Sequence, residues 1–562
     1  MSKYSNACVK GFLHAQGRKL VNGQGEEVIL RGTGVGNWTN PEGFMIGGGM
    51  NNTNPFLEDG FSLPGRFERG RTMYSTIAEL CGREYADRFQ EQWALNYLRE
   101  GDIRLMAQLG YNSVRLPIAA RMLLKEGPGI RFNETILSQI DSILDWCEQY
   151  KIYAILDLHA APAGQSGLGC DDGLDNQGHF FSEPESRERG IVIWETLAKR
   201  YRDRWIVGGY DLLNEPLSTP ALAGKYPLLK EFYDECIRRV RAIDKNHLFT
   251  LEGTVVSSDL SIFDHDYDPE CHNWCVHMHQ YRFDGDVREI YPVLALSRQL
   301  NVPVWYGEGG STLQADAVFY DMIATYGIGF NRWCWKAAAF PDGGSMGICA
   351  YKNPEDFDKV SAYFTGGPRP SYEESIRIFD QVLENVKIEN CTVNEEVVRY
   401  MLHQQGITLP AAGYAHGTPE DNLFSGGCYE GNAWAYRTDD HTRLVLKDGL
   451  IPETRVTEKM PGFRPSGRDA LSELLLELHE GEFATYVIRD VKTPCPVTLR
   501  ARALEDCQLT AETVGQTAKA DVPVRKNFAE VKLLTLAPCE EGKVRIQVKK
   551  GTLQIESIAF HR

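Results

Sequence analysis

Several features that would place a chain of 562 residues in a well-defined class are missing from this sequence. Its apolar runs, such as the one around Ile152–Leu156, are far shorter than the ~20 residues that a membrane span requires. Positive charge is scarce, because the formal net charge is −17. Nucleic acids and anionic membranes favour basic surfaces, so neither is an expected partner.

A secretory leader and a paired-cysteine motif are also missing. The first residues, MSKYSNACVKGF, lack the apolar stretch of a signal peptide. The fourteen cysteines include no CxxC pair, and the CxxxC spacing of Cys271 and Cys275 is a weak metal signal. Cys147 and Cys334 lie in apolar runs, where a free thiol acts as a small hydrophobe. We therefore predict reduced thiols and a cytoplasmic protein, or a secreted one if a leader has been removed.

What the sequence does contain is one repeated theme over its first ~370 residues, namely a short apolar strand, a polar loop and an amphipathic helix. The strands are apolar on both faces, as is typical of a parallel sheet covered on both sides. Eightfold alternation of this kind predicts the α/β class and a closed (β/α)8 TIM barrel. The strand candidates are 28–35, 111–116, 152–158, 207–213, 247–251, 274–281, 302–306 and 328–335.

A doubly wound open sheet is the structural alternative for this alternation. It would require a GxGxxG fingerprint after the first strand, and GTGVGN departs from that pattern. Two insertions, 39–75 and 160–187, follow predicted strands and would lie over the C-terminal mouth of a barrel. Long loops there are often functional, although they can also be surface elaborations.

From about residue 428 the pattern changes to alternating polar and apolar residues. Such stretches indicate strands with one solvated face and predict an all-β sandwich of roughly 130 residues. The strand candidates there are 483–489, 496–503, 529–536 and 543–549. The predicted organisation is a catalytic barrel over 1–390, a helical linker over 391–427 and a β-sandwich over 428–562.

Polar and aromatic residues fall at the predicted C-terminal ends of the barrel strands, which meet at one mouth in a barrel. These candidates are Arg115, His159, Asn214, Glu215, His279, Tyr281, Glu308, Trp333 and Trp335. Each of them, taken alone, can be explained without a functional role. A Glu beside Gly, for example, is usually a solvated loop residue. Their order along one eightfold pattern is what favours a shared site.

Glu215 and Glu308 are the candidates for catalytic carboxylates. Glycoside hydrolysis needs one carboxyl to protonate the leaving oxygen and another to attack the anomeric carbon. A retaining pair stands ~5–5.5 Å apart. Asn214 can bind a sugar hydroxyl, while Arg115 and Tyr281 are neighbours that would keep a nucleophilic carboxylate ionised.

His277 and His279 share one face of a predicted strand and can be interpreted as an HxH metal pair. The HxH of metal-dependent barrel hydrolases belongs on the first strand, and the sequence offers no third ligand here. We therefore expect His277 to be a hydrogen-bonded residue inside the barrel, and we assign no metal and no cofactor.

The ordered motifs of the chain resemble those of glycoside hydrolase family 5. The matches span about residues 10–340 and are ILRGTGVGNW, NSVRLPI, LDLHAAP, LLNEP, HQY, WYGEGG and RWCWK. The resemblance implies a retaining β-glycosidase barrel with Glu215 as acid/base and Glu308 as nucleophile. It implies supporting roles for Arg115, His159, Asn214, His279 and Tyr281, and a sugar platform at Trp333 or Trp335. Trp38 is a further aromatic subsite candidate.

The resemblance implies an enzyme that cleaves β-linked glucose oligo- or polysaccharides. The insertion 160–187, with LHAAPAGQSG and GLDNQG, resembles a loop of exo-β-1,3-glucanases. It favours an exo-acting β-glucosidase or exo-β-1,3-glucanase over an endo-β-1,4-glucanase of cellulase type. A non-catalytic carbohydrate-binding barrel and a metal-dependent barrel hydrolase are the alternatives from other classes.

The C-terminal region resembles carbohydrate-binding modules in two stretches, 481–503 and 551–562. Neither stretch identifies a sugar site, so the module either binds sugar or only packs on the barrel. The expected partner of the chain is its carbohydrate substrate. The exact sugar, the linkage and the oligomeric state stay open at this point.

Overall fold

The structure is a computed structural model, and it describes residues 3–47, 66–125, 127–281, 290–416, 421–424, 443–447, 471 and 474–562. Contacts divide the chain into two compact units. The first comprises Met1–His279, Val293–Glu308 and Ile328–Asn394, and the second comprises Gln280–Pro292, Gly309–Gly327 and Glu395–Arg562. None of the helices in the described ranges combines the length and the apolar character that crossing a bilayer demands.

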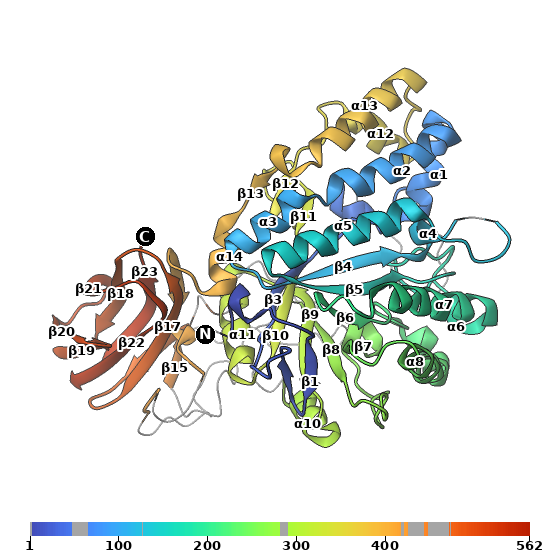
Figure 1. Cartoon of the computed structure of the whole chain (residues 1–562). Coiled ribbons are helices and arrows are strands. Elements are labelled where there is room, and N and C mark those ends of the chain that lie inside the picture. The colour runs from blue at the N-terminus through green and yellow to red at the C-terminus, as the bar shows by residue number, and fades with distance from the viewer. Residues whose placement is uncertain are drawn as a thin grey trace. The chain divides into compact units, whose positions relative to one another are not determined.

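Eight parallel strands close into a barrel in the order β10-β3-β4-β5-β6-β7-β8-β9 (Figure 1). β10 closes the ring because it pairs in parallel with both β3 and β9. Every residue of β4 and β5 is buried, which explains why the barrel strands are apolar on both faces. The strands are β3 (Arg31–Gly34), β4 (Ser113–Ala119), β5 (Tyr153–Ala160), β6 (Val207–Asp211), β7 (Phe249–Glu252), β8 (Trp274–Tyr281), β9 (Val304–Gly310) and β10 (Gly329–Trp333). Each overlaps one predicted strand, so the predicted barrel is confirmed.

The helices between the barrel strands bury one apolar face each. In α5 (Glu134–Tyr150) the side chain of Asn133 caps the first turn, and Ile136, Ile140 and Leu144 lie on the buried face, as the 3.6-residue period predicts. Other helices between the strands are α1 (Gly70–Cys81), α2 (Arg83–Tyr97), α3 (Glu100–Leu109), α4 (Ala120–Leu123), α6 (His179–Ser182), α7 (Pro184–Tyr201), α8 (Tyr226–Arg241), α9 (Thr254–Ser257) and α10 (Tyr291–Leu300). Two more, α12 (Phe357–Phe364) and α13 (Tyr372–Asn385), follow β10.

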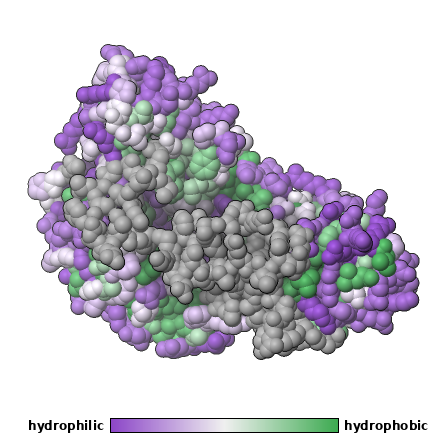
Figure 2. Space-filling model, turned by 180° about the vertical axis from the view of Figure 1, so that it is seen from behind, coloured by the Kyte–Doolittle hydropathy of each residue, from purple (hydrophilic) through white to green (hydrophobic). Residues whose placement is uncertain are grey.

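Two small sheets accompany the barrel. One is the hairpin of β1 (His14–Gln16) and β2 (Lys19–Val21). The other joins β11 (Lys336–Ala338), β12 (Cys349–Tyr351) and β13 (Thr392–Val393). On the face of the molecule in Figure 2, hydrophilic residues cover most of the coloured surface, with smaller hydrophobic patches between them.

The C-terminal region folds into two antiparallel sheets, so the predicted all-β sandwich is confirmed. Apolar residues such as Leu476, Leu499 and Ile546 alternate inward and form its core. One sheet holds β15 (Arg443–Leu446), β16 (Leu474–Leu478), β23 (Leu553–Phe560), β18 (Cys495–Ala503), β21 (Ala529–Leu536) and β14 (Ile407–Pro410); the other holds β17 (Phe483–Val491), β22 (Cys539–Lys550), β19 (Cys507–Thr513) and β20 (Gln516–Val522).

The predicted linker, 391–427, contains more structure than a helix. Its helix is α14 (Glu395–Leu402), but the same segment also contains β14, which pairs with β23 of the sandwich sheet. A backbone ladder of this kind is set by the partner strand and leaves little trace in a four-residue sequence. The boundary proposed at 427 lies outside the described residues, and the domain limits stay predictions.

The second unit also includes the helix that directly follows β9, namely α11 (Leu313–Thr325). Ala315, Ala317 and Val318 of this helix share a hydrophobic core with Tyr400 and the sandwich strands. In sequence, α11 lies between two barrel strands, yet its apolar contacts are those of the C-terminal unit.

Candidate active site

A buried arginine on β4 organises the barrel rim. Arg115 is fully buried, and its guanidinium contacts five polar side chains. They are Asp211 Oδ2 (2.7 Å), Glu308 Oε2 (2.8 Å), Asn214 Oδ1 (2.8 Å), Glu252 Oε1 (2.9 Å) and Asp157 Oδ2 (3.1 Å). Burial alone would lower the pKa of Arg115, but the surrounding carboxylates raise it well above its usual value. Arg115 is therefore a fixed positive charge that orients the acidic groups of the rim.

Glu215 and Glu308 face each other across His279. The imidazole Nδ1 donates to Glu215 Oε1 at 2.8 Å and lies 3.8 Å from Glu308 Oε1. One carboxylate oxygen of Glu215 lies within 4.8 Å of one of Glu308. Each of the two residues is 6% exposed. This separation fits a retaining pair, since an inverting pair needs ~6.5–9.5 Å to admit a water between the carboxyls.

The two carboxylates differ in their hydrogen-bond partners. Burial would raise the pKa of Glu215, but the hydrogen bond and the charge of His279 lower it below its usual value. Burial likewise opposes protonation of His279, while the charges of Glu252 and Glu308 raise its pKa well above the usual value. Both directions place the proton on His279 and leave Glu215 ionised, with the two groups joined by a 2.8 Å hydrogen bond. A pair coupled in this way titrates as a unit.

Glu252, at the end of β7, connects these groups, and sequence reasoning missed it. Its Oε2 accepts the backbone N–H of Glu215 at 2.7 Å. Its Oε1 lies 3.3 Å from both His277 Nδ1 and His279 Nε2. The signal was available, because Glu252 directly follows the predicted strand 247–251, for which no functional residue had been assigned.

His277 lies inside the barrel, as expected. Its Nδ1 is 3.1 Å from Asp211 Oδ1, and its ring lies 4.4 Å from that of Trp305. Ligand atoms of Glu252, His277 and His279 lie within 4.8 Å of one another, so the structure supplies the third potential metal ligand that the sequence did not. A bound cation would lie close to the guanidinium of Arg115, which already donates to Glu252 at 2.9 Å, and electrostatic repulsion disfavours that arrangement.

The backbone at Glu215 is held in a strained conformation. Glu215 and Leu217 have φ angles of 41° and 50°, in the left-handed region. The N–H of Leu217 donates to Gln165 O at 2.9 Å, and Ser218 Oγ donates to Glu215 O at 2.8 Å. Strain of this kind persists where surrounding contacts hold it, and it is concentrated at functional sites.

His159 and Trp333 form a stacked pair at the ends of β5 and β10. Their rings are 5.2 Å apart and inclined by 5°. Burial lowers the pKa of His159 to about 3, so its ring is neutral and its Nδ1 donates to Asp157 Oδ2 at 2.7 Å. Trp333 is 6% exposed, so of the two platform candidates it is the one with a surface to offer.

Trp335 and Trp38 occupy interior positions instead. Both side chains are fully buried; the indole N–H of Trp335 donates to Asp102 Oδ1 and that of Trp38 to Ala94 O. Trp38 also lines a small apolar cavity of about 40 Å³. Rings without an exposed face do not reach a sugar, so these positions fit packing roles better than the expected subsite roles.

Asn214 and Tyr281 complete the expected set. Asn214, the residue before Glu215, is buried at the rim. Its Oδ1 accepts a hydrogen bond from the guanidinium of Arg115. Tyr281 is the last residue of β8, is partly exposed and falls in the second unit by its contacts. That Tyr281 acts as a neighbour of the Glu308 carboxylate stays a prediction.

A third buried carboxyl, Glu42, was also missed by sequence reasoning. It precedes the 3-10 helix Gly43–Met45 in the first insertion and is 6% exposed. Burial, followed by the charges of Glu308 and Glu215, raises its pKa well above the usual value. Glu42 is therefore a neutral carboxyl that lies close enough to Glu215 and Glu308 for their charges to act on it. Its position after the first barrel strand, in NWTNPEG, was the available signal.

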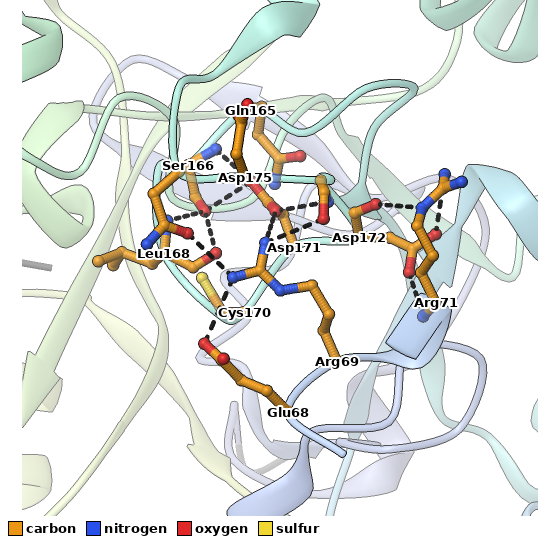
Figure 3. A network of polar contacts seen from close by, with 12 residues as sticks. Glu68, Arg69, Arg71, Gln165, Ser166, Leu168, Cys170, Asp171, Asp172 and Asp175 are labelled. Carbon is orange, nitrogen blue, oxygen red and sulfur yellow. Dashed lines mark hydrogen bonds and ion pairs between the residues drawn. The ribbon is translucent and has the colours of Figure 1, made fainter. Parts of the chain in front are cut away.

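Polar side chains of the second insertion bond to one another and to Arg69 and Arg71 (Figure 3). One of them, Gln165, also connects the insertion to the rim. Gln165 donates to the backbone oxygens of His159 and Asn214, at 2.8 Å in each case. Its Oε1 accepts the N–H of Ala161 at 2.9 Å. Gln165 therefore links the ends of β5 and β6, which carry two of the predicted site residues.

Comparison with known proteins agrees with this arrangement. Residues 78–339 match the family model described as "Cellulase (glycosyl hydrolase family 5)". The chain is 29% identical to "Beta-xylosidase" from Phanerodontia chrysosporium over 49% of this chain and 52% of that protein. It is 28% identical to "Glucan 1,3-beta-glucosidase" from Schwanniomyces occidentalis over 40% of this chain and 50% of the relative. It is also 28% identical to "Endoglucanase C" from Acetivibrio thermocellus over 32% and 50%, respectively.

The chain thus spans about half the length of the curated relatives that it matches. The matched region, residues 78–339, includes β4 to β10 and both facing glutamates. This part of the barrel is therefore similar to the barrels of glycosyl hydrolase family 5.

Proposed function

We propose that the barrel hydrolyses β-glycosidic bonds with retention of configuration, with Glu308 as nucleophile and Glu215 as acid/base. The observation that carries this proposal is the facing pair itself, with oxygens of the two carboxylates within 4.8 Å of each other. The two carboxylates differ in their hydrogen-bond partners. Glu308 is bonded to the fixed cation Arg115, whereas Glu215 accepts a hydrogen bond from His279, which holds a proton that it can pass to Glu215.

In the first step, the Glu308 carboxylate attacks the anomeric carbon and forms a glycosyl ester, while the bond to the leaving oxygen breaks. Glu215 delivers the proton that this oxygen needs, drawing it from the pair with His279. In the second step, Glu215 takes a proton from an attacking water, and the ester bond to Glu308 breaks. Arg115 stabilises Glu308 as the departing carboxylate.

For the substrate, we propose β-linked glucose oligosaccharides cleaved from one end, in the manner of an exo-acting β-glucosidase or exo-β-1,3-glucanase. The ordered second insertion, anchored to the rim through Gln165, supports a cleft closed at one side. A relative named glucan 1,3-beta-glucosidase supports the same choice. An endo-β-1,4-glucanase is the second candidate, favoured by the relative named endoglucanase C.

For the cellular setting, we propose a reducing compartment. All thirteen cysteines in the described part of the chain are free, and most of them are buried. Thiols in this state fit a protein whose stability does not depend on disulfides.

The proposal is tested with laminari- and cello-oligosaccharides and with the variants Glu308→Ala and Glu215→Ala. Each variant should lose roughly 10³-fold or more in kcat while remaining folded. NMR of the first-formed product should show the β anomer. Glu231→Gln, on the exposed side of α8, is the matched control and should keep full activity.

An α anomer as first product, or an active Glu308→Ala enzyme, would contradict the retaining mechanism. Products longer than one sugar at the earliest time points would exclude the exo-acting choice and support the endo-acting one. Binding without turnover over the whole panel would indicate a non-catalytic carbohydrate-binding barrel.

A further inference from the structure

A thiol lies against the carboxylate of Glu215. Resting on the proposed function, we infer that Cys170 is a positioning residue whose S–H donates to Glu215 Oε2 and fixes the orientation of the acid/base. The sulfur is 3.3 Å from Oε2, within hydrogen-bonding range for sulfur. Since His279 occupies Oε1 at 2.8 Å, both oxygens of Glu215 have a donor.

The thiol keeps its proton in this environment. Burial, followed by the charges of Glu215, Glu42 and Asp171, raises the pKa of Cys170 well above its usual value. A protonated thiol is a donor and a poor nucleophile, so Cys170 does not compete with Glu308 for the sugar. The neutral thiol also adds no charge to a rim that is already rich in carboxylates.

The backbone around Cys170 is held by neighbouring polar groups. The carbonyl of Cys170 accepts Asn40 Nδ2 at 2.8 Å, from the first insertion. The next residue, Asp171, accepts the N–H and the hydroxyl of Ser166, both at 2.7 Å, and the N–H of Gly173 at 2.8 Å (Figure 3). The turn that carries the thiol is therefore closed on itself.

Arginines from outside the insertion hold this turn in place. The fully buried Arg69 lies 3.5 Å from Asp171 Oδ1 and donates to Gly173 O at 3.1 Å. Asp172 accepts the backbone N–H of Arg71 at 2.6 Å and the Nε of Arg121 at 2.9 Å. Since α1 and α4 both hold the turn, the thiol has a defined position that an ordinary surface cysteine lacks.

The role has a consequence for pH dependence. Glu215 faces His279 on β8, His159 on β5 and the thiol, while Arg115, Glu252, Glu308 and Glu42 surround this group. A donor to the ionised carboxylate lowers the pKa of Glu215, so removing the thiol should raise it. Glu215 would then stay protonated to higher pH, and the basic limb of kcat/KM would move upward.

The test compares Cys170→Ala, which removes the donor, with Cys170→Ser, which keeps one, and with the control Cys271→Ala. Two β-glucosides are used, one with an alkyl leaving group that needs an acid and one with a dinitrophenyl leaving group that does not. Cys170→Ala should lose roughly five- to tenfold in kcat/KM on the alkyl glucoside, as expected for one lost hydrogen bond from a weak donor such as a thiol. On the dinitrophenyl glucoside it should stay close to wild type.

Cys170→Ser should recover most of the loss and return the basic limb toward its wild-type position, and Cys271→Ala should match wild type throughout. An equal loss on both glucosides, or no loss on either, would overturn the role of Cys170. A serine variant as slow as the alanine variant would overturn hydrogen-bond donation. A wild-type protein that cleaves no glycoside would overturn the proposed function and this role with it.

Discussion

The barrel rim and the sandwich treat charged side chains in opposite ways. At the rim, Arg115, Asp157, Asp211 and Glu252 are all fully buried and bonded to one another or to histidines. Along β22 of the sandwich, buried Val544, Ile546 and Val548 alternate with polar residues that are exposed or half-buried. Burying ions is expensive, and apolar packing of similar volume is often more stable. The difference indicates that the rim is arranged for chemistry and the sandwich for packing.

The largest difference between the two regions should appear when one arginine is removed from each. Arg115→Ala leaves four carboxylates without their cation, so we expect about 3–5 kcal/mol of lost stability and no measurable turnover. Arg500→Ala removes an exposed arginine from its pair with Glu556 and should cost at most about 1 kcal/mol. Chemical denaturation and kcat measurements on both variants supply the comparison.

If Arg115→Ala were as stable as Arg500→Ala, the rim charges would not depend on their common cation. If instead Arg115→Ala kept its turnover, the rim would not be the site of the chemistry. Arg115→Lys is a useful intermediate, because it keeps the charge but cannot reproduce the planar fork that reaches several carboxylates at once.

A smaller effect should follow from Glu252→Gln, which removes one charge from the rim and keeps the shape. The charge of Glu252 raises the pKa of His279, so removing this charge should let the proton of His279 leave at lower pH. The basic limb of kcat/KM should move down, opposite to the shift expected for Cys170→Ala. We also expect roughly tenfold lower kcat, because the N–H of Glu215 loses a charged acceptor.

A pH–rate profile measured from the acid to the basic limb checks this prediction. Asp244, a buried carboxylate bonded to His247, provides a matched control as Asp244→Asn. That variant removes a buried charge next to a histidine in the barrel without touching Glu215. If the basic limb of kcat/KM also moved down in Asp244→Asn, the shift would result from the loss of any buried charge and not from the contact of Glu252 with the site.

The same comparison explains how far the sequence could predict the molecule. The barrel strands are short apolar runs separated by polar loops, so each could be located from pattern alone, and Glu215 and Glu308 followed from their strand ends. Of the missed groups, Glu252 and Glu42 had a positional signal, because each follows a predicted barrel strand, whereas Cys170 had none. Their importance comes from which side chains lie near them in space, and a sequence without coordinates does not contain that information.

The buried tryptophans show the same limit from the other side. Trp38 and Trp335 are of the residue type expected in a sugar platform, but aromatic residues occur both in cores and in sugar subsites. Only the position of the ring separates the roles, and here the indole N–H groups of both donate to interior acceptors. In the sandwich, β14 was missed for a related reason, because its pairing with β23 is specified by the partner.

The smallest effect should come from Glu42→Gln, and it concerns stability more than rate. Because the pKa of Glu42 is raised in the folded protein, the folded state holds a proton that the unfolded chain releases above its ordinary pKa. Folding stability attributable to Glu42 therefore falls as pH rises above that ordinary value. Glutamine is neutral at every pH, so Glu42→Gln should raise Tm by a few degrees at neutral pH and leave it unchanged in acid. Activity should change by less than about threefold, since a neutral side chain replaces a neutral carboxyl. A Tm gain of equal size in acid and at neutral pH would mean that the carboxyl of Glu42 is ionised in the folded protein, and the rim would then hold one more charge than its hydrogen bonds account for.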